Sequence, residues 1–126
     1  MMKDEAYLQR LLTGWEEVAK HGQLTLWVLL ALKDGPKHMA DIKTFIAEAT
    51  NQTLMVDEKS LYRALRRYYD TEMVDYESAP GKGPDRKVYR LNSLGAELLR
   101  RFIQRNIADV FWKPAIIQLM KEEKHS

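Results

Sequence analysis

The sequence predicts a mainly α-helical fold with one small two-stranded sheet. Apolar residues recur at three- and four-residue intervals in several segments, which is the spacing of amphipathic helices. Two short segments, 74–78 and 87–91, alternate as strands do, and residues typical of turns separate them. A short basic helix comes directly before this hairpin. That order is typical of a winged helix-turn-helix domain, here with additional N- and C-terminal helices.

Two helices are expected in the N-terminal part of the chain. Residues 4–20 carry an apolar stripe on one face, and His21-Gly22 is a suitable stop. Residues 24–33 are apolar nearly all round, so this helix should lie in the core. Asp34-Gly35-Pro36 should end it, because glycine accepts the left-handed cap and proline cannot continue the helix. The stripe of the first helix includes Leu8, Leu11, Leu12 and Trp15.

Two more helices should complete the helical part of the domain. A third is expected over residues 37–50, and residues 54–56 can then form a very short strand or an anchoring loop. Asp57 is a natural N-cap for the fourth helix, because its carboxylate can accept a hydrogen bond from a backbone N–H. The inner face of that helix should consist of Leu61, Ala64, Leu65 and Tyr68.

A last long helix should follow the hairpin. Asn92 or Ser93 can cap its start, and Pro114 should break or kink it near Trp112. Its apolar stripe is wider than the small domain can cover by itself. We therefore divide the chain into an N-terminal helix (1–22), a winged helix-turn-helix domain (23–91) and a C-terminal helix with its tail (92–126). The stripe includes Leu98, Leu99, Phe102, Ile103, Ile107, Val110 and Phe111.

Composition narrows the class of protein. The chain has 126 residues, which suffices for one domain with a modest core. It has no cysteine, so disulfides and thiolate metal sites are excluded and a reducing, cytoplasmic setting is expected. The charged N-terminus predicts no secretory signal, and the apolar run 24–32 is too short for a membrane span.

The distribution of charge indicates nucleic acid more clearly than the net charge does. The whole chain carries only +2. Residues 59–90 hold eight Lys and Arg against five Asp and Glu, whereas the remainder holds twelve against thirteen. The positive excess is therefore confined to the basic helix and the hairpin. A face that is merely solvated is the alternative interpretation.

A winged helix would place the basic helix in a DNA major groove and the wing against the adjacent backbone. Lys59, Ser60 and Arg63 lie in the first turns of that helix, and Arg63 can make a bidentate contact with guanine. Arg66 and Arg67 lie farther along, where phosphates are the expected partners. The predicted DNA contacts are Lys59, Ser60, Tyr62, Arg63, Arg66, Arg67, Lys82, Arg86 and Lys87.

Other chemistries find little support in the sequence. Tyr62, one of the predicted DNA contacts, either donates a hydrogen bond to a phosphate or packs on the helix with its hydroxyl in solvent.

The three histidines are scattered, so no metal site is expected. No phosphate-binding glycine loop and no catalytic set of side chains is evident, so neither a cofactor nor an enzyme activity is predicted.

Four segments, in this order, resemble the PadR-like family of transcriptional regulators. The resemblance covers residues 24–99, most of the chain. Three places depart from the family pattern: Met39-Ala40 stand where Gly-Tyr is usual, Asn92 stands where threonine is usual, and Met73 stands where glycine is usual. Asparagine caps a helix as threonine does, whereas Met73 is expected to alter the turn into the wing. The segments are Leu32-Lys33-Asp34-Gly35-Pro36 with His38 and Asp41-Ile42, Ser60-Leu61-Tyr62-Arg63-Ala64-Leu65-Arg66-Arg67, Gly81 to Leu91, and Gly95 with Leu98-Leu99.

The resemblance implies a homodimer that represses nearby genes from a palindromic operator in double-stranded DNA. The C-terminal helix, with the N-terminal helix, would form the dimer interface through Leu8, Leu11, Leu12, Trp15, Leu98, Leu99, Phe102, Ile103, Ile107, Val110 and Phe111. Some family members bind small aromatic or hydrophobic compounds near that interface. Trp15 and Trp112 either line such a pocket or fill the dimer core, and the second is favoured because interfaces are rich in Trp. The main alternative function is a protein-interaction module that uses the same surfaces.

Overall fold

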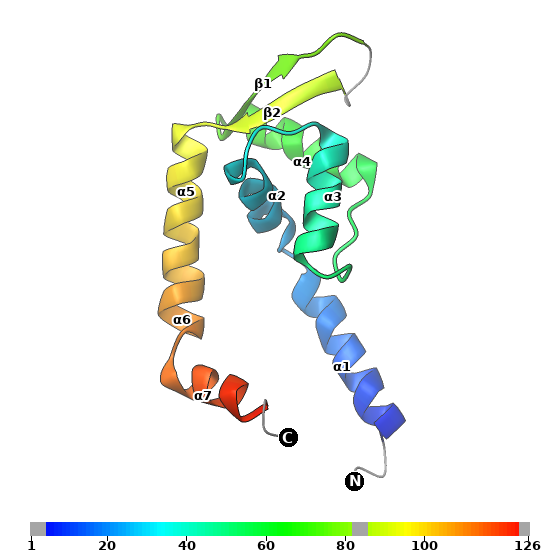
Figure 1. Ribbon diagram of the computed structural model, residues 1–126, viewed down its shortest axis with the longest axis vertical. Helices are drawn as coiled ribbons and strands as arrows, with labels where there is room; N and C mark the ends of the chain where they lie inside the picture. Colours follow the sequence, from blue (N-terminus) through cyan, green and yellow to red (C-terminus); the bar gives the residue numbers. More distant parts are fainter. Residues whose placement is uncertain (1–4, 82–85, 124–126) are drawn as a thin grey trace.

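The computed structural model describes residues 5–81 and 86–123 and has the predicted mainly helical architecture (Figure 1). Among these residues, no helix is both long and apolar enough to span a bilayer. The helices are α1 (Glu5–Lys20), α2 (Leu24–Lys33), α3 (Met39–Ala49), α4 (Glu58–Asp70), α5 (Ser93–Ile103), a π-helical turn (Gln104–Ala108), α6 (Asp109–Phe111) and α7 (Pro114–Glu123); the strands are β1 (Val74–Ser78) and β2 (Lys87–Leu91).

The core lies where α2, α3, α4, the wing and the start of α5 meet. Residues of α2 are central to it, as predicted, and Val28 and Ala31 are completely buried. The predicted inner face of α4 is confirmed, since Leu61, Ala64, Leu65 and Tyr68 are all buried. The Tyr68 hydroxyl shares a 2.7 Å hydrogen bond with the hydroxyl of Thr25, which ties α4 to α2. Residues 54–56 form the anchoring loop rather than a strand.

The wing is an antiparallel pair of strands with one face toward the core. Its register pairs Val74 with Leu91 and Tyr76 with Tyr89. Because side chains alternate along a strand, these pairs share the inner face. The backbones of Lys37 and Tyr89 exchange two hydrogen bonds of 2.9 Å, which fix β2 to the loop before α3. The wing is thereby attached to the domain at the middle of β2.

The turn from α4 into the wing shows how the chain accommodates Met73. The left-handed residue is Glu72, with φ of 64°, and Met73 is not among the residues with positive φ. The backbone N–H of Met73 donates to the Tyr68 carbonyl at 2.9 Å, and that of Glu72 donates to the Tyr69 carbonyl at 3.0 Å. These two bonds form the C-terminal cap in which one residue is left-handed. Met73 therefore needs no left-handed backbone conformation. The left-handed residue of this turn is Glu72, one residue earlier.

Replacing Glu72 with glycine is expected to stabilise the fold by about 1 kcal/mol, because a side chain in the left-handed region is strained. The midpoint of urea unfolding measures this gain. Thr71→Gly is the control, since Thr71 has φ of −96° and gains nothing from glycine. A midpoint unchanged or lowered in Glu72→Gly would contradict the assigned strain.

Two helical arms extend away from the domain. Figure 1 shows α1 and the segment from α5 to α7 on opposite sides, both leading away from the wing. No residue of α1 is buried. The predicted break near Trp112 is confirmed, and Pro114 begins a new helix, α7. The π-helical turn before it was not predicted. The structure also corrects one residue of the stripe on α5: Leu99, only 5% exposed, belongs to the core of the single chain.

Candidate nucleic-acid interface

Asp57 caps the basic helix α4. Its carboxylate accepts a hydrogen bond from the Ser60 backbone N–H at 2.8 Å and a second from the Ser60 hydroxyl, also at 2.8 Å. These bonds, with the positive charge of Arg63 nearby, lower the pKa of Asp57 below its ordinary value. Ser60, predicted as a DNA contact, is half-buried and uses its hydroxyl proton for this cap.

Replacing Asp57 with alanine is expected to lower the melting temperature, because the first turn of α4 loses its cap. Asp57→Asn is the matched control, since asparagine also caps. A lowered carboxyl pKa in the folded state stabilises above the unfolded pKa, and this stabilisation is lost as pH falls through the folded pKa. The difference between Asp57→Ala and the parent protein should therefore shrink in acid. Equal melting temperatures at neutral pH would exclude the cap.

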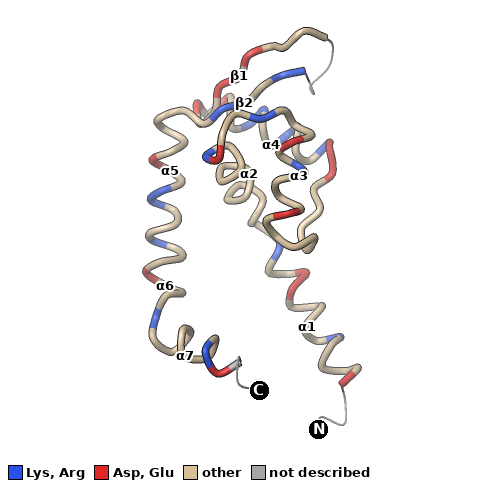
Figure 2. The backbone as a smooth tube through the Cα atoms, in the orientation of Figure 1, with Lys and Arg blue, Asp and Glu red and all other residues tan. Residues whose placement is uncertain are grey.

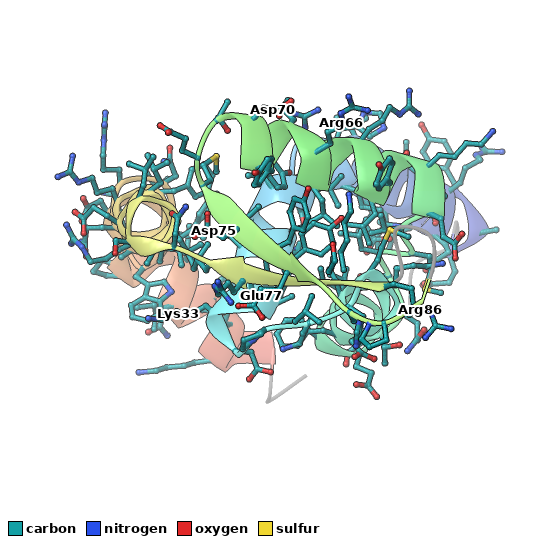
Figure 3. The ribbon with its side chains drawn as sticks, turned by 90° about the horizontal axis from the view of Figure 1, so that it is seen from above. Lys33, Arg66, Asp70, Asp75, Glu77 and Arg86 are labelled. Atoms are coloured by element: carbon teal, nitrogen blue, oxygen red, sulfur yellow. The ribbon has the colours of Figure 1, made fainter. Side chains whose placement is uncertain are left out.

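The outer face of α4 carries four basic side chains. Lys59, Arg63, Arg66 and Arg67 are all exposed. Among the described residues, none of the four forms an ion pair, so their charges are available to a ligand. Figure 3 labels Arg66 on α4, where it also borders the hollow between this helix and the wing. An exposed basic face of this kind is the arrangement that phosphate binding requires.

Basic and acidic residues lie on different parts of the wing. Figure 2 shows basic positions on α4 and at the outer end of β2, and acidic positions on β1. Arg86 is exposed at the outer end of the wing (Figure 3). Lys82, predicted as a contact at the wing tip, lies outside the described residues. The guanidinium of Arg90 is paired with Glu77 at 2.9 Å, so its charge is largely neutralised.

Two predicted contacts, Lys87 and Tyr62, lie together between the wing and α4. The Lys87 ammonium is 4.5 Å from the centroid of the Tyr76 ring and 5.8 Å from that of Tyr62. Tyr62 is half-buried and packs against the core. Sequence reasoning assigned no role to Tyr76, although the alternation in 74–78 and 87–91 places it on the same face of the sheet as Lys87.

The apolar positions predicted for a dimer interface are exposed in the single chain, with three exceptions on the C-terminal arm. Leu99 is buried, Ile103 packs against the core, and Ile107 is half-buried. Trp15 and Trp112 are 74% and 69% exposed and lie on separate arms, so one chain does not form a pocket from both. The exposed predicted positions are Leu8, Leu11, Leu12, Trp15, Leu98, Phe102, Val110 and Phe111.

A hollow of about 430 Å³ lies elsewhere, between α2 and the C-terminal arm. Leu26, Leu29 and Phe102 are among the apolar residues that line it, and Arg101 and Arg105 are among the polar ones. Neither Trp15 nor Trp112 contributes to it. Within residues 5–81 and 86–123, no three His, Asp or Glu side chains gather as metal ligands would.

A helical domain with a two-stranded wing and an unpaired basic face on the helix before it defines a winged helix-turn-helix protein. The sequence pattern described as "Transcriptional regulator PadR-like family" matches residues 28–101, which is more than half of the chain. The chain belongs to the PadR-like family of transcriptional regulators. It is therefore grouped with regulators of transcription and not with enzymes. None of the curated proteins matches the chain.

Solved structures share this fold. A PadR-like transcription factor from Bacteroides fragilis is 25% identical, with a TM-score of 0.59 over 89% of this chain and 97% of that chain. A PadR-like transcriptional regulator from Bacillus cereus is also 25% identical, with a TM-score of 0.55 over 66% of this chain and 80% of that one. Bacillus subtilis PadR in complex with operator DNA is 19% identical, with a TM-score of 0.58 over 82% of this chain and 60% of its own.

Proposed function

We propose that this protein is a cytoplasmic, homodimeric repressor that binds a palindromic operator in double-stranded DNA. The observation that carries the proposal is the unpaired basic face of α4 beside the wing. The B. subtilis relative was solved on operator DNA, which supports DNA as the ligand of this fold. In a symmetric dimer the two α4 helices would lie about 34–36 Å apart and enter successive major grooves.

A binding titration tests this function. Purified protein is titrated against its own upstream DNA and a scrambled duplex of equal length, at low and moderate salt. Binding through several Lys and Arg side chains should weaken steeply as salt rises, because phosphate contacts release counterions. Preference for the upstream duplex supports a specific regulator. A folded protein that binds neither duplex would instead favour the protein-interaction module.

The exposed apolar face of α1 supports the dimer. Leu8, Leu11, Leu12 and Trp15 lie on one side of a helix in which no side chain is buried. An apolar stripe of this kind is normally covered by another surface. Phe102, Val110 and Phe111 on the C-terminal arm present a second exposed apolar set.

Leu11→Asp is expected to convert the dimer into a monomer, because a carboxylate would be buried without a partner. Sedimentation equilibrium measures the change in mass. Thr13→Asp is the matched control, since Thr13 lies on the opposite side of α1 and should leave the mass unchanged. A Leu11→Asp protein that remains dimeric would exclude α1 from the interface.

A flat hydrophobic effector would act on the same assembly. The large exposed areas of Trp15 and Trp112 support binding near the arms. Such a compound can release DNA only if it binds the two dimer geometries with different affinities. Quenching of Trp fluorescence together with lowered DNA affinity would support this role. Quenching with unchanged DNA affinity would refute it.

A further inference from the structure

A basic side chain of the wing lies in an aromatic hollow between the wing and α4. The hollow has a volume of about 380 Å³. Its lining includes four tyrosines together with Lys87. Tyr62 and Tyr69 belong to α4, Tyr76 belongs to β1 and Tyr89 belongs to β2. The hollow therefore forms a junction between the helix that carries the basic face and both strands of the wing.

The ammonium of Lys87 is placed for cation–π attraction to two of these rings. It lies 4.5 Å from the centroid of Tyr76 and 5.8 Å from that of Tyr62. Both distances fall within the range of about 6 Å at which a ring attracts a cation. The Tyr76 ring in turn packs on Tyr69, with centroids 4.8 Å apart, and on Tyr89, at 5.7 Å. The cation thus contacts α4 directly through Tyr62 and indirectly through the stack of rings.

The strand register explains why Lys87 points inward. Lys87 pairs with Ser78, and Tyr76 pairs with Tyr89 on the same face of the sheet. Lys87 is half-buried, whereas its neighbour Arg86 is exposed. These two adjacent basic residues therefore lie on different surfaces, and Arg86 is the more exposed of the two.

The wing needs such a contact because a two-stranded hairpin is only marginally stable by itself. The middle of β2 is held by the backbone hydrogen bonds between Lys37 and Tyr89. Lys87 is the first residue of β2 and pairs with Ser78, the last residue of β1, so it lies at the outer end of the strands, two residues from Tyr89. A contact from Lys87 to Tyr62 consequently fixes the outer part of the wing to α4.

We propose that Lys87 is a positioning residue for DNA recognition. Its ammonium, held by the rings of Tyr62 and Tyr76, fixes the angle between the wing and α4, so that both can engage one DNA duplex. This role rests on the proposed DNA-binding function and replaces the direct DNA contact predicted for Lys87. It acts by preorganisation, since a wing that must be ordered on binding lowers affinity.

The contact of the Lys87 ammonium with the rings of Tyr62 and Tyr76, which we call the clamp, can be tested first in the free protein. Proton NMR is expected to show the ε-methylene protons of Lys87 upfield of those of the other lysines, because they lie over aromatic rings. Tyr76→Leu should remove this displacement, and Arg86→Gln, the neighbouring control, should preserve it. If the ε-methylene protons of Lys87 have the same chemical shift as those of the other lysines in the parent protein, the proposal is overturned, whether or not the protein binds DNA.

DNA titration then tests the positioning role. With the upstream duplex as probe, Lys87→Gln is expected to weaken binding roughly tenfold, and Lys87→Arg, which keeps the cation, should bind like the parent. Tyr76→Leu should weaken binding similarly, and Tyr76→Phe should not. The double variant Lys87→Gln with Tyr76→Leu should be no weaker than Lys87→Gln alone, because both changes remove one interaction.

The alternative outcomes are distinct. If Lys87 contacts phosphate directly, the two losses add and Lys87→Gln reduces the salt slope by about one. That result would overturn the clamp and leave the proposed function standing. If the parent binds no DNA, the proposed function fails, while the NMR displacement still decides whether the clamp exists. If Tyr76→Leu does not fold, the salt slope of Lys87→Gln decides the role, since it should equal that of the parent if Lys87 only positions the wing.

Discussion

Replacing Arg63 with glutamate is expected to lower affinity for the operator and for random DNA by roughly a hundredfold or more. Arg63 is exposed on α4 and has no ion-pair partner among the described residues. Lys59, Arg66 and Arg67 lie three or four residues away, so they share its side of the helix. The substitution removes a base or phosphate contact and adds a carboxylate that repels phosphates. The loss should therefore extend to DNA of any sequence.

Fluorescence anisotropy with labelled duplexes measures this loss. Lys33→Glu is the matched control, because it makes the same change in charge and Figure 3 places Lys33 on the opposite side of the molecule from Arg66. If net charge alone governed binding, both variants would weaken equally. If α4 is the reading helix, only Arg63→Glu loses binding to this extent.

Arg63→Ala separates base reading from simple charge attraction. A side chain that reads guanine should cost the operator about 1–3 kcal/mol more than random DNA when it is removed. A side chain that contacts only phosphate should weaken both duplexes by the same factor. Binding that survives both Arg63→Glu and Arg63→Ala would show that α4 is not the recognition helix.

The helices and strands of the domain follow closely from local sequence signals. Residues 24–33 are followed by Asp34-Gly35-Pro36, and α2 ends at Lys33 as expected. Asp57 and Asn92 cap α4 and α5, because each has a side-chain oxygen that accepts an N–H three residues later. These signals act within a few residues of the chain, so the sequence displays them directly.

Features that depend on contacts between residues distant in sequence were harder to predict from the sequence. The place of Lys87 at the wing predicted a DNA contact, whereas the packing of its ammonium depends on strand register and on rings from α4 and β1. Leu99 belongs to an apolar stripe that faces the core at some positions and solvent at others. Helical periodicity does not distinguish these two kinds of position. The π-helical turn at Gln104–Ala108 adds a residue to one turn, and no short sequence motif predicts it.

Gly95 shows how one small residue joins α5 to the wing. Gly95 is buried, and a Cβ atom there would collide with the backbone carbonyl oxygen of Met73 and with the side chain of Leu91. Its N–H donates to Asn92 at 2.9 Å, and the Asn92 amide donates to the carbonyl of Glu72 at 2.7 Å. The start of α5 is therefore fixed against the turn between α4 and β1.

Gly95→Ala is expected to destabilise the fold by about 2 kcal/mol, because the added methyl group must displace backbone in a packed region. Alanine favours helix over glycine by about 1 kcal/mol, so the measured loss is what remains after that gain. Gly14→Ala in α1 is the matched control: no atom lies within 4 Å of its added methyl, and stability should not fall. The same substitution should thus lower the unfolding midpoint at one helical site only. If both variants were equally stable, the close approach between α5 and the turn before β1 would be wrong.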